Sequence, residues 1–152
     1  FTQKYWVDPL VNFILKQETE VAIKNDPLNT TYIIEGKTFV LTDGKAEGVQ
    51  VFGEPVYGDG VDDAALLLTM QSGGSGTFFY AVEAISVGGR YKGTNAVFLG
   101  DRIAPQNINI IDGVAVANFA DRNPGESFAV QPSLGKSIWL NLTADSLVGV
   151  TK

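Results

Sequence analysis

The stretch "DAALLLTMQSGGSGTFFYAVEAISV", residues 63–87, decides the fold of this chain. It contains two apolar runs, 63–71 and 76–87, on either side of the glycine-rich segment 72–76. The second run is rich in aromatic and β-branched residues, which favour strands. A continuous apolar run of this length is typical of a strand that is buried on both faces. We therefore expect two adjacent central strands joined by a flexible glycine turn.

Shorter strand candidates surround this pair. Upstream, "TTYIIEG" and "KTFVLTDG" alternate apolar and polar residues around Gly36, and Asp43-Gly44 is a pair typical of hairpin turns. Downstream, Asp112-Gly113 is expected to close a second hairpin. The further strand candidates are 95–100, 106–111, 114–119 and 136–143, and the expected loops are 88–93 and 122–127. Short strands separated by Gly, Asp and Pro turns predict a mainly β fold, either an antiparallel β-sandwich or a barrel-like sheet.

The N-terminal part of the chain has a different pattern. Residues 8–23 place apolar side chains at helical spacing, and Asp8-Pro9 suits the first turn because proline has no N–H to lose there. The pattern predicts one N-terminal α-helix. The segment 24–29, "KNDPLN", is expected to be a linker. We therefore expect a helical arm or stalk over 1–28 and a β-rich domain over 29–152.

Large apolar side chains on this arm make it a candidate for interaction. Tyr5, Trp6 and Phe13 would either pack on the β domain or dock on another subunit. A third possibility is a stalk that leads from a removed membrane anchor. In the β domain, Tyr91 lies in a glycine-rich segment and is the aromatic ring that we expect to be exposed.

Composition excludes several classes of function. The chain of 152 residues has a formal net charge of −6 and scattered basic residues, which argues against binding to nucleic acid or to an anionic membrane surface. It has no cysteine and no histidine, which excludes thiol nucleophiles, disulfides, Cys/His zinc sites and histidine bases. The lack of cysteine suits an extracytoplasmic protein. No stretch approaches the ~18–20 apolar residues of a membrane span, so direct insertion into a membrane is not expected.

Three aspartates, Asp59, Asp62 and Asp63, precede the first apolar run. An EF-hand-type calcium loop needs oxygen ligands at its first, third and fifth positions, glycine at the sixth and an acid at the ninth or twelfth. With Asp59 at the fifth position Asp63 is the ninth, but the first and third positions are then Pro55 and Tyr57. Proline offers no side-chain oxygen. The alternatives are a weak calcium site, with calcium as the only cofactor, and a tight turn with solvated or capping aspartates.

A short pattern recurs in "FLGDRIAPQ" and "NFADRNPGE", where an apolar run ends in Asp-Arg before a proline. The two pairs are Asp101 with Arg102 and Asp121 with Arg122. They flank a predicted hairpin, so we expect them on neighbouring strand ends. Each arginine would then form a bidentate bridge to the aspartate of the other pair. The alternative is an anion or carboxylate ligand held by two guanidinium groups.

Several stretches together are similar to a family of uncharacterised bacterial exported domains that is common in candidate-phyla genomes. The resemblance covers residues 29–142 and rests on "GDGVDDA", "GGSGTFFYAV", "LGDRIAPQ" and "ADRNPGE". It implies an extracytoplasmic β domain, tethered to a surface or membrane behind an N-terminal signal or anchor, without an established activity. Family members tend to read D-x-N-G-D-G-x-x-D-A. Here Asp59, Asp62 and Asp63 match that pattern, whereas Pro55 and Tyr57 depart from it.

These observations favour a non-enzymatic domain of the cell envelope that binds a protein or glycan at the cell surface. One alternative is a subunit of a surface filament or layer that uses residues 1–23 to assemble with other copies. Another is a carboxylate-dependent hydrolase, because paired carboxylates can cleave glycosides. No spacing singles out one pair among the candidate acids, which are Glu54, Asp59, Asp62, Asp63, Asp101, Asp121 and Glu126.

Overall fold

The computed structural model describes residues 24–58, 63–144 and 146–151. The strands in these ranges are β1 (Thr31–Ile34), β2 (Lys37–Val40), β3 (Lys45–Ala46), β4 (Val49–Tyr57), β5 (Ala64–Met70), β6 (Phe78–Val87), β7 (Arg90–Gly93), β8 (Val97–Asp101), β9 (Ala104–Ile111), β10 (Val114–Asp121), β11 (Leu134–Thr143) and β12 (Ser146–Thr151). All of the strand pairs are antiparallel. The expectation of a mainly β, antiparallel fold is therefore confirmed. The helix predicted over 8–23 lies outside the described residues.

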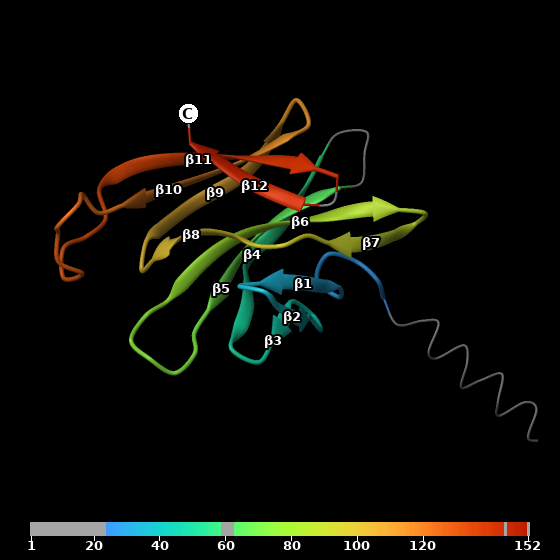
Figure 1. Ribbon diagram of the computed structural model, residues 1–152, viewed down its shortest axis with the longest axis horizontal. Helices are drawn as coiled ribbons and strands as arrows, with labels where there is room; N and C mark the ends of the chain where they lie inside the picture. Colours follow the sequence, from blue (N-terminus) through green and yellow to red (C-terminus); the bar gives the residue numbers. More distant parts are fainter. Residues whose placement is uncertain (1–23, 59–62, 145, 152) are drawn as a thin grey trace, which may run out of the picture.

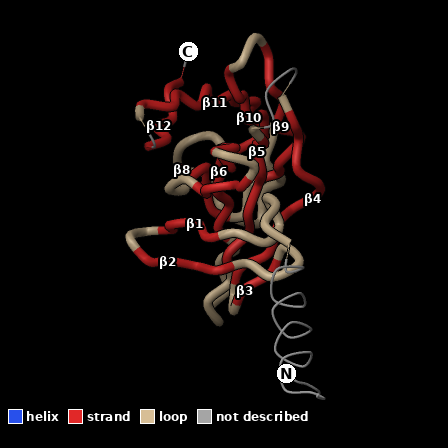
Figure 2. Tube along the Cα trace, turned by 90° about the vertical axis from the view of Figure 1, so that its right-hand side faces the viewer, coloured by secondary structure: helices blue, strands red, loops and turns tan. Residues whose placement is uncertain are grey.

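The strands form layers around one central sheet. The six-stranded sheet has the order β3-β4-β5-β6-β7, and β8 pairs with β6 beyond the end of β7. A four-stranded sheet of order β12-β11-β10-β9 covers one face of the central sheet, and the β1–β2 hairpin lies against the other face (Figure 1). Figure 2 shows the same order of layers from the side.

The two central strands are β5 and β6, as the sequence predicted. Because successive side chains of a strand point to opposite faces, each of these strands contributes to two separate cores. Ala65 and Leu67 of β5 pack toward the four-stranded sheet, whereas the intervening Leu66 packs toward the β1–β2 hairpin. The first core contains Ala65, Leu67, Phe79, Ala81, Leu99, Ile103, Ile108, Ala115, Ala117, Phe119, Leu140 and Leu147. The second contains Tyr32, Ile34, Leu41, Val49, Ala64, Leu66, Leu68, Tyr80, Val82 and Ala84.

The hairpin turns have the backbone that their residues favour. Asp43-Gly44 and Asp112-Gly113 both have positive φ at both residues, close to 50° for the aspartate and 80° for the glycine. This is the type I′ geometry, which matches the twist of the flanking strands. Glu35-Gly36 has the same geometry between β1 and β2. The predicted turns at Asp43-Gly44 and Asp112-Gly113 are confirmed.

Three strands, β4, β7 and β12, were not predicted from the sequence. β4 contains Gly53 and Pro55, which interrupt its alternating pattern. It tolerates them through a bulge in which the three residues from Gly53 to Pro55 lie opposite Leu66 of β5 alone. β7 occupies 90–93, within the segment that was expected to be a loop, and pairs with the end of β6. β12 contains Gly149, and a Cβ there would lie 2.7 Å from the Val97 side chain.

Residues 24–29, which were expected to be a linker, pack on the β domain. The side chain of Asn25 donates a hydrogen bond to the carbonyl oxygen of Tyr91 at 3.3 Å. Pro27 is fully buried and its carbonyl oxygen accepts a hydrogen bond from the Tyr32 hydroxyl at 2.7 Å. Leu28 accepts a backbone hydrogen bond from Gly44. An arm that ended at residue 28 would therefore include part of the packed domain.

The segment between β7 and β8 joins all three layers. The side-chain amide of Asn95 donates to the carbonyl oxygen of Leu147 in β12 and accepts from the Leu147 N–H, both at 2.8 Å. Thr94 is buried, and its hydroxyl oxygen accepts a hydrogen bond from the backbone N–H of Glu83 at 3.0 Å. On the other side, Ile33 of β1 donates to the carbonyl oxygen of Thr94. Polar groups thus connect the outer layers to β6 through one short segment.

Gly93 precedes this segment at a point where β1 crosses very close to β7. A Cβ at Gly93 would overlap the carbonyl oxygen of Thr31 and the ring of Tyr32. We predict that Gly93→Ala lowers the free energy of unfolding by about 1–3 kcal/mol, because a backbone oxygen cannot move aside as a side chain can. Urea unfolding would measure the loss. Gly135→Ala in β11 is the matched control, because a Cβ there meets no atom within 4 Å. Equal effects of the two substitutions would contradict the prediction.

Candidate functional site

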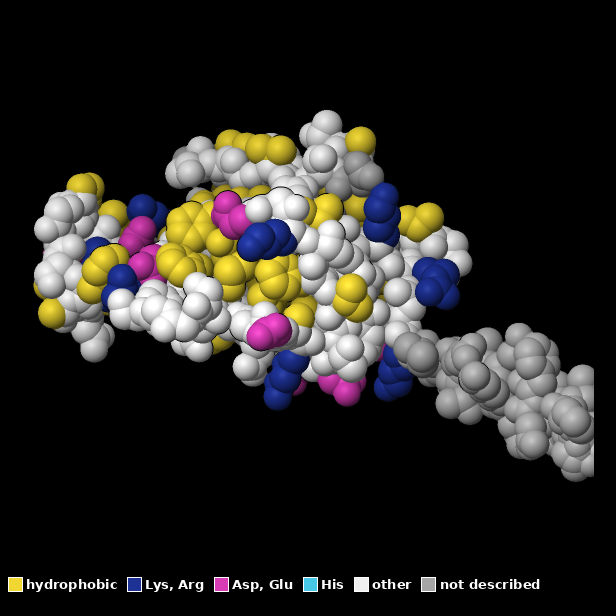
Figure 3. Space-filling model, turned by 60° about the horizontal axis from the view of Figure 1, so that its bottom comes forward, with side chains coloured by type: hydrophobic (Ala, Val, Ile, Leu, Met, Phe, Trp, Pro, Cys, Tyr) yellow, Lys and Arg dark blue, Asp and Glu magenta, His cyan; other side chains and the backbone are white. Residues whose placement is uncertain are grey.

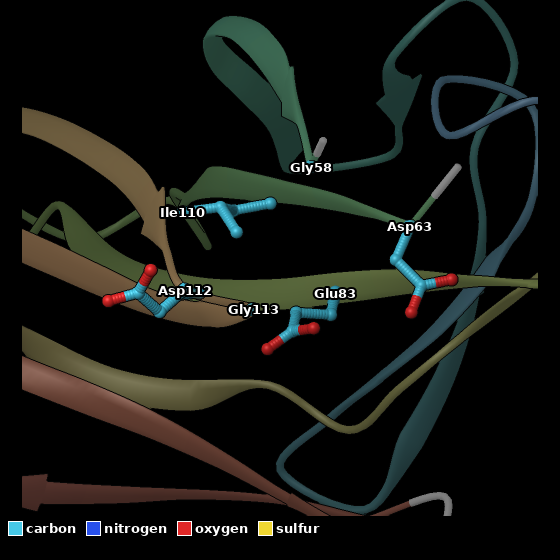
Figure 4. A pocket seen from close by; sticks show the side chains of 7 residues that line it. Gly58, Asp63, Glu83, Ile110, Asp112 and Gly113 are labelled. Atoms are coloured by element: carbon cyan, nitrogen blue, oxygen red, sulfur yellow. The ribbon is translucent and has the colours of Figure 1, made fainter. Parts of the chain in front are cut away.

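A pocket of about 410 Å³ opens between the two larger sheets, at the end where β9 turns into β10. Its walls come from both sheets, and Figure 4 shows the side chains that line it. The lining residues are Gly58, Asp63, Glu83, Ile110, Asp112, Gly113 and Ala115. Three of them carry carboxylates and none carries a positive charge.

Glu83 provides the buried carboxylate of the pocket. Phe79 and Ala81 of β6 face the four-stranded sheet, and strand alternation places Glu83 next in that series. Its relative exposure is 8%, yet no hydrogen bond or ion pair joins its carboxylate to another residue in the described part of the chain. Burial, with a smaller contribution from the negative charge of Asp63, raises the pKa of Glu83 to about 7. A carboxylic acid with this pKa changes its charge near neutral pH.

The other two carboxylates lie at the rim. Asp63 is half-buried just before β5, and its Oδ1 accepts a hydrogen bond from the backbone N–H of Ser86 at 2.8 Å. Asp112 is exposed in the β9–β10 turn, and Figure 4 shows its carboxylate directed away from that of Glu83. Within 24–58, 63–144 and 146–151, no three acidic side chains converge in a way that could hold a metal ion.

The predicted calcium residues meet this pocket only in part. Asp63 lines it, whereas Asp59 and Asp62 lie outside the described residues. Pro55 and Tyr57, which occupy the first and third positions of the expected loop, belong to β4, and Tyr57 pairs with Ala64 of β5. An EF-hand-type loop that begins at Pro55 is therefore not what the chain forms there. Calcium binding itself stays a prediction.

The two Asp-Arg pairs are brought together at the opposite end of β9 and β10, but not in the expected way. Arg102 forms a bidentate pair with its own neighbour Asp101, at 3.1 and 2.8 Å. Asp121 pairs instead with Lys136 at 3.1 Å. The reciprocal bridges are absent, because the guanidinium of Arg102 pairs with Asp101 and that of Arg122 donates to backbone carbonyl oxygens. Burial alone would raise the pKa of Asp121, but the backbone N–H of Arg122 and the ammonium of Lys136 hold it below its usual value.

Arg122 instead secures the loop over 122–133. Its guanidinium donates to the carbonyl oxygens of Val130 at 2.7 Å, Phe128 at 3.1 Å and Arg102 at 2.7 Å. The guanidinium carbons of Arg102 and Arg122 lie 3.6 and 5.2 Å from the centre of the Phe128 ring. Each guanidinium is thus occupied by protein acceptors and an aromatic face. This arrangement supports a structural role and leaves little capacity for an anionic ligand.

Of the predicted interaction residues, Tyr91 alone lies in the described part of the chain. Tyr5, Trp6 and Phe13 lie outside the described residues. Tyr91 is half-buried in β7 and packs against the second core, and its backbone N–H and carbonyl both bond to the side chain of Asn25. The expectation that Tyr91 is the exposed ring is therefore wrong, because the segment before β1 holds it in place.

A second hollow of about 550 Å³ lies between the β1–β2 hairpin and the ends of β4 and β5. Its charged residues, Glu35, Lys37 and Glu47, are exposed to solvent. Figure 3 shows apolar side chains gathered at the centre of the lower face of the molecule, with charged ones among them. The aromatic ring of Phe98 in β8 is 49% exposed and contacts the ring of Tyr80, with the two centroids 5.4 Å apart. This hollow has no buried polar group that would fix the orientation of a ligand.

No family model, curated protein or solved structure matches this chain. The resemblance to bacterial exported domains therefore stays a prediction. In the part of the chain that the structure describes, no helix has both the length and the apolar character needed to cross a membrane.

Glu83 is not among the site residues predicted from the sequence, although the sequence contains a sign of it. Glu83 is the only charged residue in 76–87, a run that was predicted to be buried on both faces for part of its length. A charge in such a strand must be paired, solvated at an end of the sheet or part of a site. The candidate acids that the structure describes lie in turns, at strand ends or, as Glu54 does, at an exposed strand position, where carboxylates are common and carry little information.

The pKa of Glu83 predicts a dependence of stability on pH. A folded pKa above the value of 4.5 for the free side chain means that the folded state favours the protonated form. Stability is then lost as pH rises through the interval from 4.5 to 7 and is constant above it. We predict that the difference in unfolding free energy between the wild type and Glu83→Gln changes by about 2–3 kcal/mol from pH 5 to pH 8, in favour of the variant.

Urea unfolding at several pH values would measure this difference. Glu54→Gln is the matched control, because Glu54 is exposed on β4 and its substitution should leave the pH profile of the wild type unchanged. A Glu83→Gln profile parallel to that of the wild type would show that Glu83 ionises normally, and the description of the pocket would be wrong.

The contacts of Arg122 predict a local effect on the loop over 122–133. We expect Arg122→Lys to speed amide hydrogen exchange of this loop by about tenfold, because lysine keeps the charge but cannot reach three carbonyl oxygens. Exchange in β5 and β6 should not change. Arg90→Lys, at an exposed position of β7, is the control. Unchanged exchange in the loop of the Arg122 variant would contradict the role assigned to Arg122.

Proposed function

We propose that this chain is a non-enzymatic binding module of the cell envelope, and that its ligand occupies the pocket lined by Asp63 and Glu83. The observation that carries the proposal is the carboxylate of Glu83, which is buried, unpartnered among the described residues and directed at a hollow of about 410 Å³. Buried polar groups in proteins almost always have a partner. A ligand is the natural partner for a group that faces a pocket.

The energetics support a ligand over a purely structural role. An uncompensated buried carboxylate makes the folded chain less stable, and a glutamine or an apolar residue would fit the same strand without this penalty. Neighbouring positions of β6 that face the same sheet, Phe79 and Ala81, are apolar. The exception at Glu83 coincides with the place where the two sheets separate into a pocket. Sites of this kind commonly combine reduced stability with function.

The envelope part of the proposal comes from the sequence. A chain without cysteine suits an extracytoplasmic location, and the resemblance to exported domains implies the same. The partners that we propose are a protein or a glycan at the cell surface, and another copy of the chain remains an alternative partner through residues 1–23. The rigid β5–β6 pair below the pocket would hold the carboxylates in place for either kind of partner.

The proposal is tested by a ligand screen read by NMR on the full chain. Mixtures of small amines, sugars and short peptides are added to the ¹⁵N-labelled protein, and the amide signals of Gly58, Gly113 and Ala115 report the pocket. We expect some members to shift these signals in the wild type and to lose this effect in Glu83→Gln. If nothing in such a screen moves the pocket signals, the pocket is not a binding site and the proposal fails.

One observation favours hydrolysis as a second candidate function. Glu83, with its raised pKa, and Asp63, whose carboxylate accepts a backbone hydrogen bond, face the same pocket in different environments. Two carboxylic groups in different environments beside one pocket are the arrangement that glycosidases use. Release of chromophore from aryl glycosides, with loss of this activity in Glu83→Gln, would favour this function over binding alone.

A further inference from the structure

We infer that the pocket binds a primary ammonium group and that Glu83 is the residue that holds it. The inference rests on the proposed function and goes beyond it, because it names the chemistry of the ligand. An ammonium group of this kind belongs to a lysine side chain, a chain N-terminus or a small amine. Three features support it: the charges that line the pocket, the lack of a partner for Glu83 among the described residues, and the arrangement of the acceptors.

The charge of the lining selects against other ligand classes. The titratable groups of the lining are the carboxylates of Asp63, Glu83 and Asp112, without a lysine or arginine. An anionic ligand would be repelled by them. A neutral ligand could accept or donate hydrogen bonds but would leave the negative charges unbalanced. A cation gains from every one of these groups, and most from the buried one, where water screens least.

The unpartnered state of Glu83 favours an ammonium group in particular. An ionised carboxylate has two acceptor oxygens and no donor, and an ammonium group has three donors and no acceptor. Hydrogen bonds between such charged groups are shorter than neutral ones and about twice as strong. Glu83 has a relative exposure of 8% and lacks a partner within the described ranges, so a bound ammonium would supply what its carboxylate lacks.

The arrangement of the acceptors argues against a bare metal ion. A calcium ion gathers six to eight oxygen ligands at about 2.3–2.6 Å, which requires several carboxylates or carbonyls around one point. In the described residues no such group of three acids exists, and Figure 4 shows the carboxylate of Asp112 directed away from that of Glu83. A volume of about 410 Å³ suits a molecule with a carbon skeleton better than a single ion. The apolar lining residues, Ile110 and Ala115, would contact that skeleton.

The charged groups around Glu83 determine how binding depends on pH. Asp63 faces it from the segment before β5, and Asp112 lies in the β9–β10 turn. Lys92 of β7 is paired with Ile85, two residue positions beyond the pair formed by Glu83 and Thr94, and therefore lies on the same face of the sheet as Glu83. An alkyl ammonium, with a pKa near 10.4, stays charged from pH 6 to pH 8. With a pKa of about 7 for Glu83, the ionised fraction, and with it the affinity, should rise about tenfold over this interval.

The experiment compares two probes of nearly the same size. The ¹⁵N-labelled full chain is titrated with n-butylammonium chloride and, separately, with butan-1-ol at pH 6 and pH 8. We expect n-butylammonium to shift the amide signals of Gly58, Gly113 and Ala115 in a saturable way, with about tenfold higher affinity at pH 8. Butan-1-ol, which has no charge, should shift these signals at least tenfold more weakly at either pH.

Two variants and one ion complete the design. Glu83→Gln keeps the shape of the side chain and should lose the binding of n-butylammonium, whereas Glu54→Gln should bind as the wild type does. Acetyl-lysine-methylamide and a peptide with a free N-terminus separate a side-chain ammonium from a terminal one. Calcium chloride at the same concentrations should not shift the amide signals of Gly58, Gly113 and Ala115.

The possible failures are distinguishable. Equal binding of the amine and the alcohol, or an affinity for the amine that falls with pH, would overturn the ammonium assignment but leave the pocket as a binding site. Calcium shifts at lower concentration than those of n-butylammonium would overturn it in favour of a metal. Absence of any pocket shift with these probes overturns the ammonium assignment, and the same absence across the whole screen overturns the proposed function.

Discussion

The structure depends on one constraint: the β5–β6 pair is apolar on both faces, so it must be covered twice. The strand alternation that sends Leu67 to one side sends Leu66 to the other, and both side chains are buried. A simple two-layer sheet would leave one of these faces in water. The chain meets the constraint with the four-stranded sheet above the pair and the β1–β2 hairpin, with residues 24–30, below it. Each outer layer therefore buries one apolar face of the β5–β6 pair.

The same constraint explains where the site lies. The first core is apolar along β6 as far as Ala81, and Glu83 follows in the same series, where the two large sheets part. Glu83 is thus close enough to the core to be desolvated and close enough to the end to face a pocket. Its backbone N–H and carbonyl oxygen both form hydrogen bonds with Thr94, the residue after β7, which fixes the backbone at this position of the sheet. Glu83 is therefore both buried and in contact with the pocket.

The two ends of β9 and β10 differ in what they do. At one end, Arg122 uses its guanidinium to join the loop over 122–133 to the β8–β9 turn, and its donors are occupied by backbone oxygens. At the other end, the β9–β10 turn borders the pocket and its acidic groups have no cation among the lining residues. The two guanidinium groups contact Asp101, backbone oxygens and the Phe128 ring, whereas the Glu83 carboxylate has no partner among the described residues. This contrast is why the pocket, and not the arginine cluster, is the better candidate for a ligand.

The sequence by itself determined the mainly β class, the central strand pair and the aspartate–glycine turns, because these follow from alternation, apolar runs and residues that tolerate positive φ. It could not determine β4 or β7, because Pro55 and the glycines interrupt the alternating pattern of these segments. Pairing of β4 with β5 and of β7 with β6 stabilises them as strands. It also could not choose partners for charges: Asp121 pairs with Lys136 and not with Arg102, since register decides which ends meet. The site was decided by tertiary structure alone, because burial gives Glu83 its chemistry and burial depends on how the layers pack.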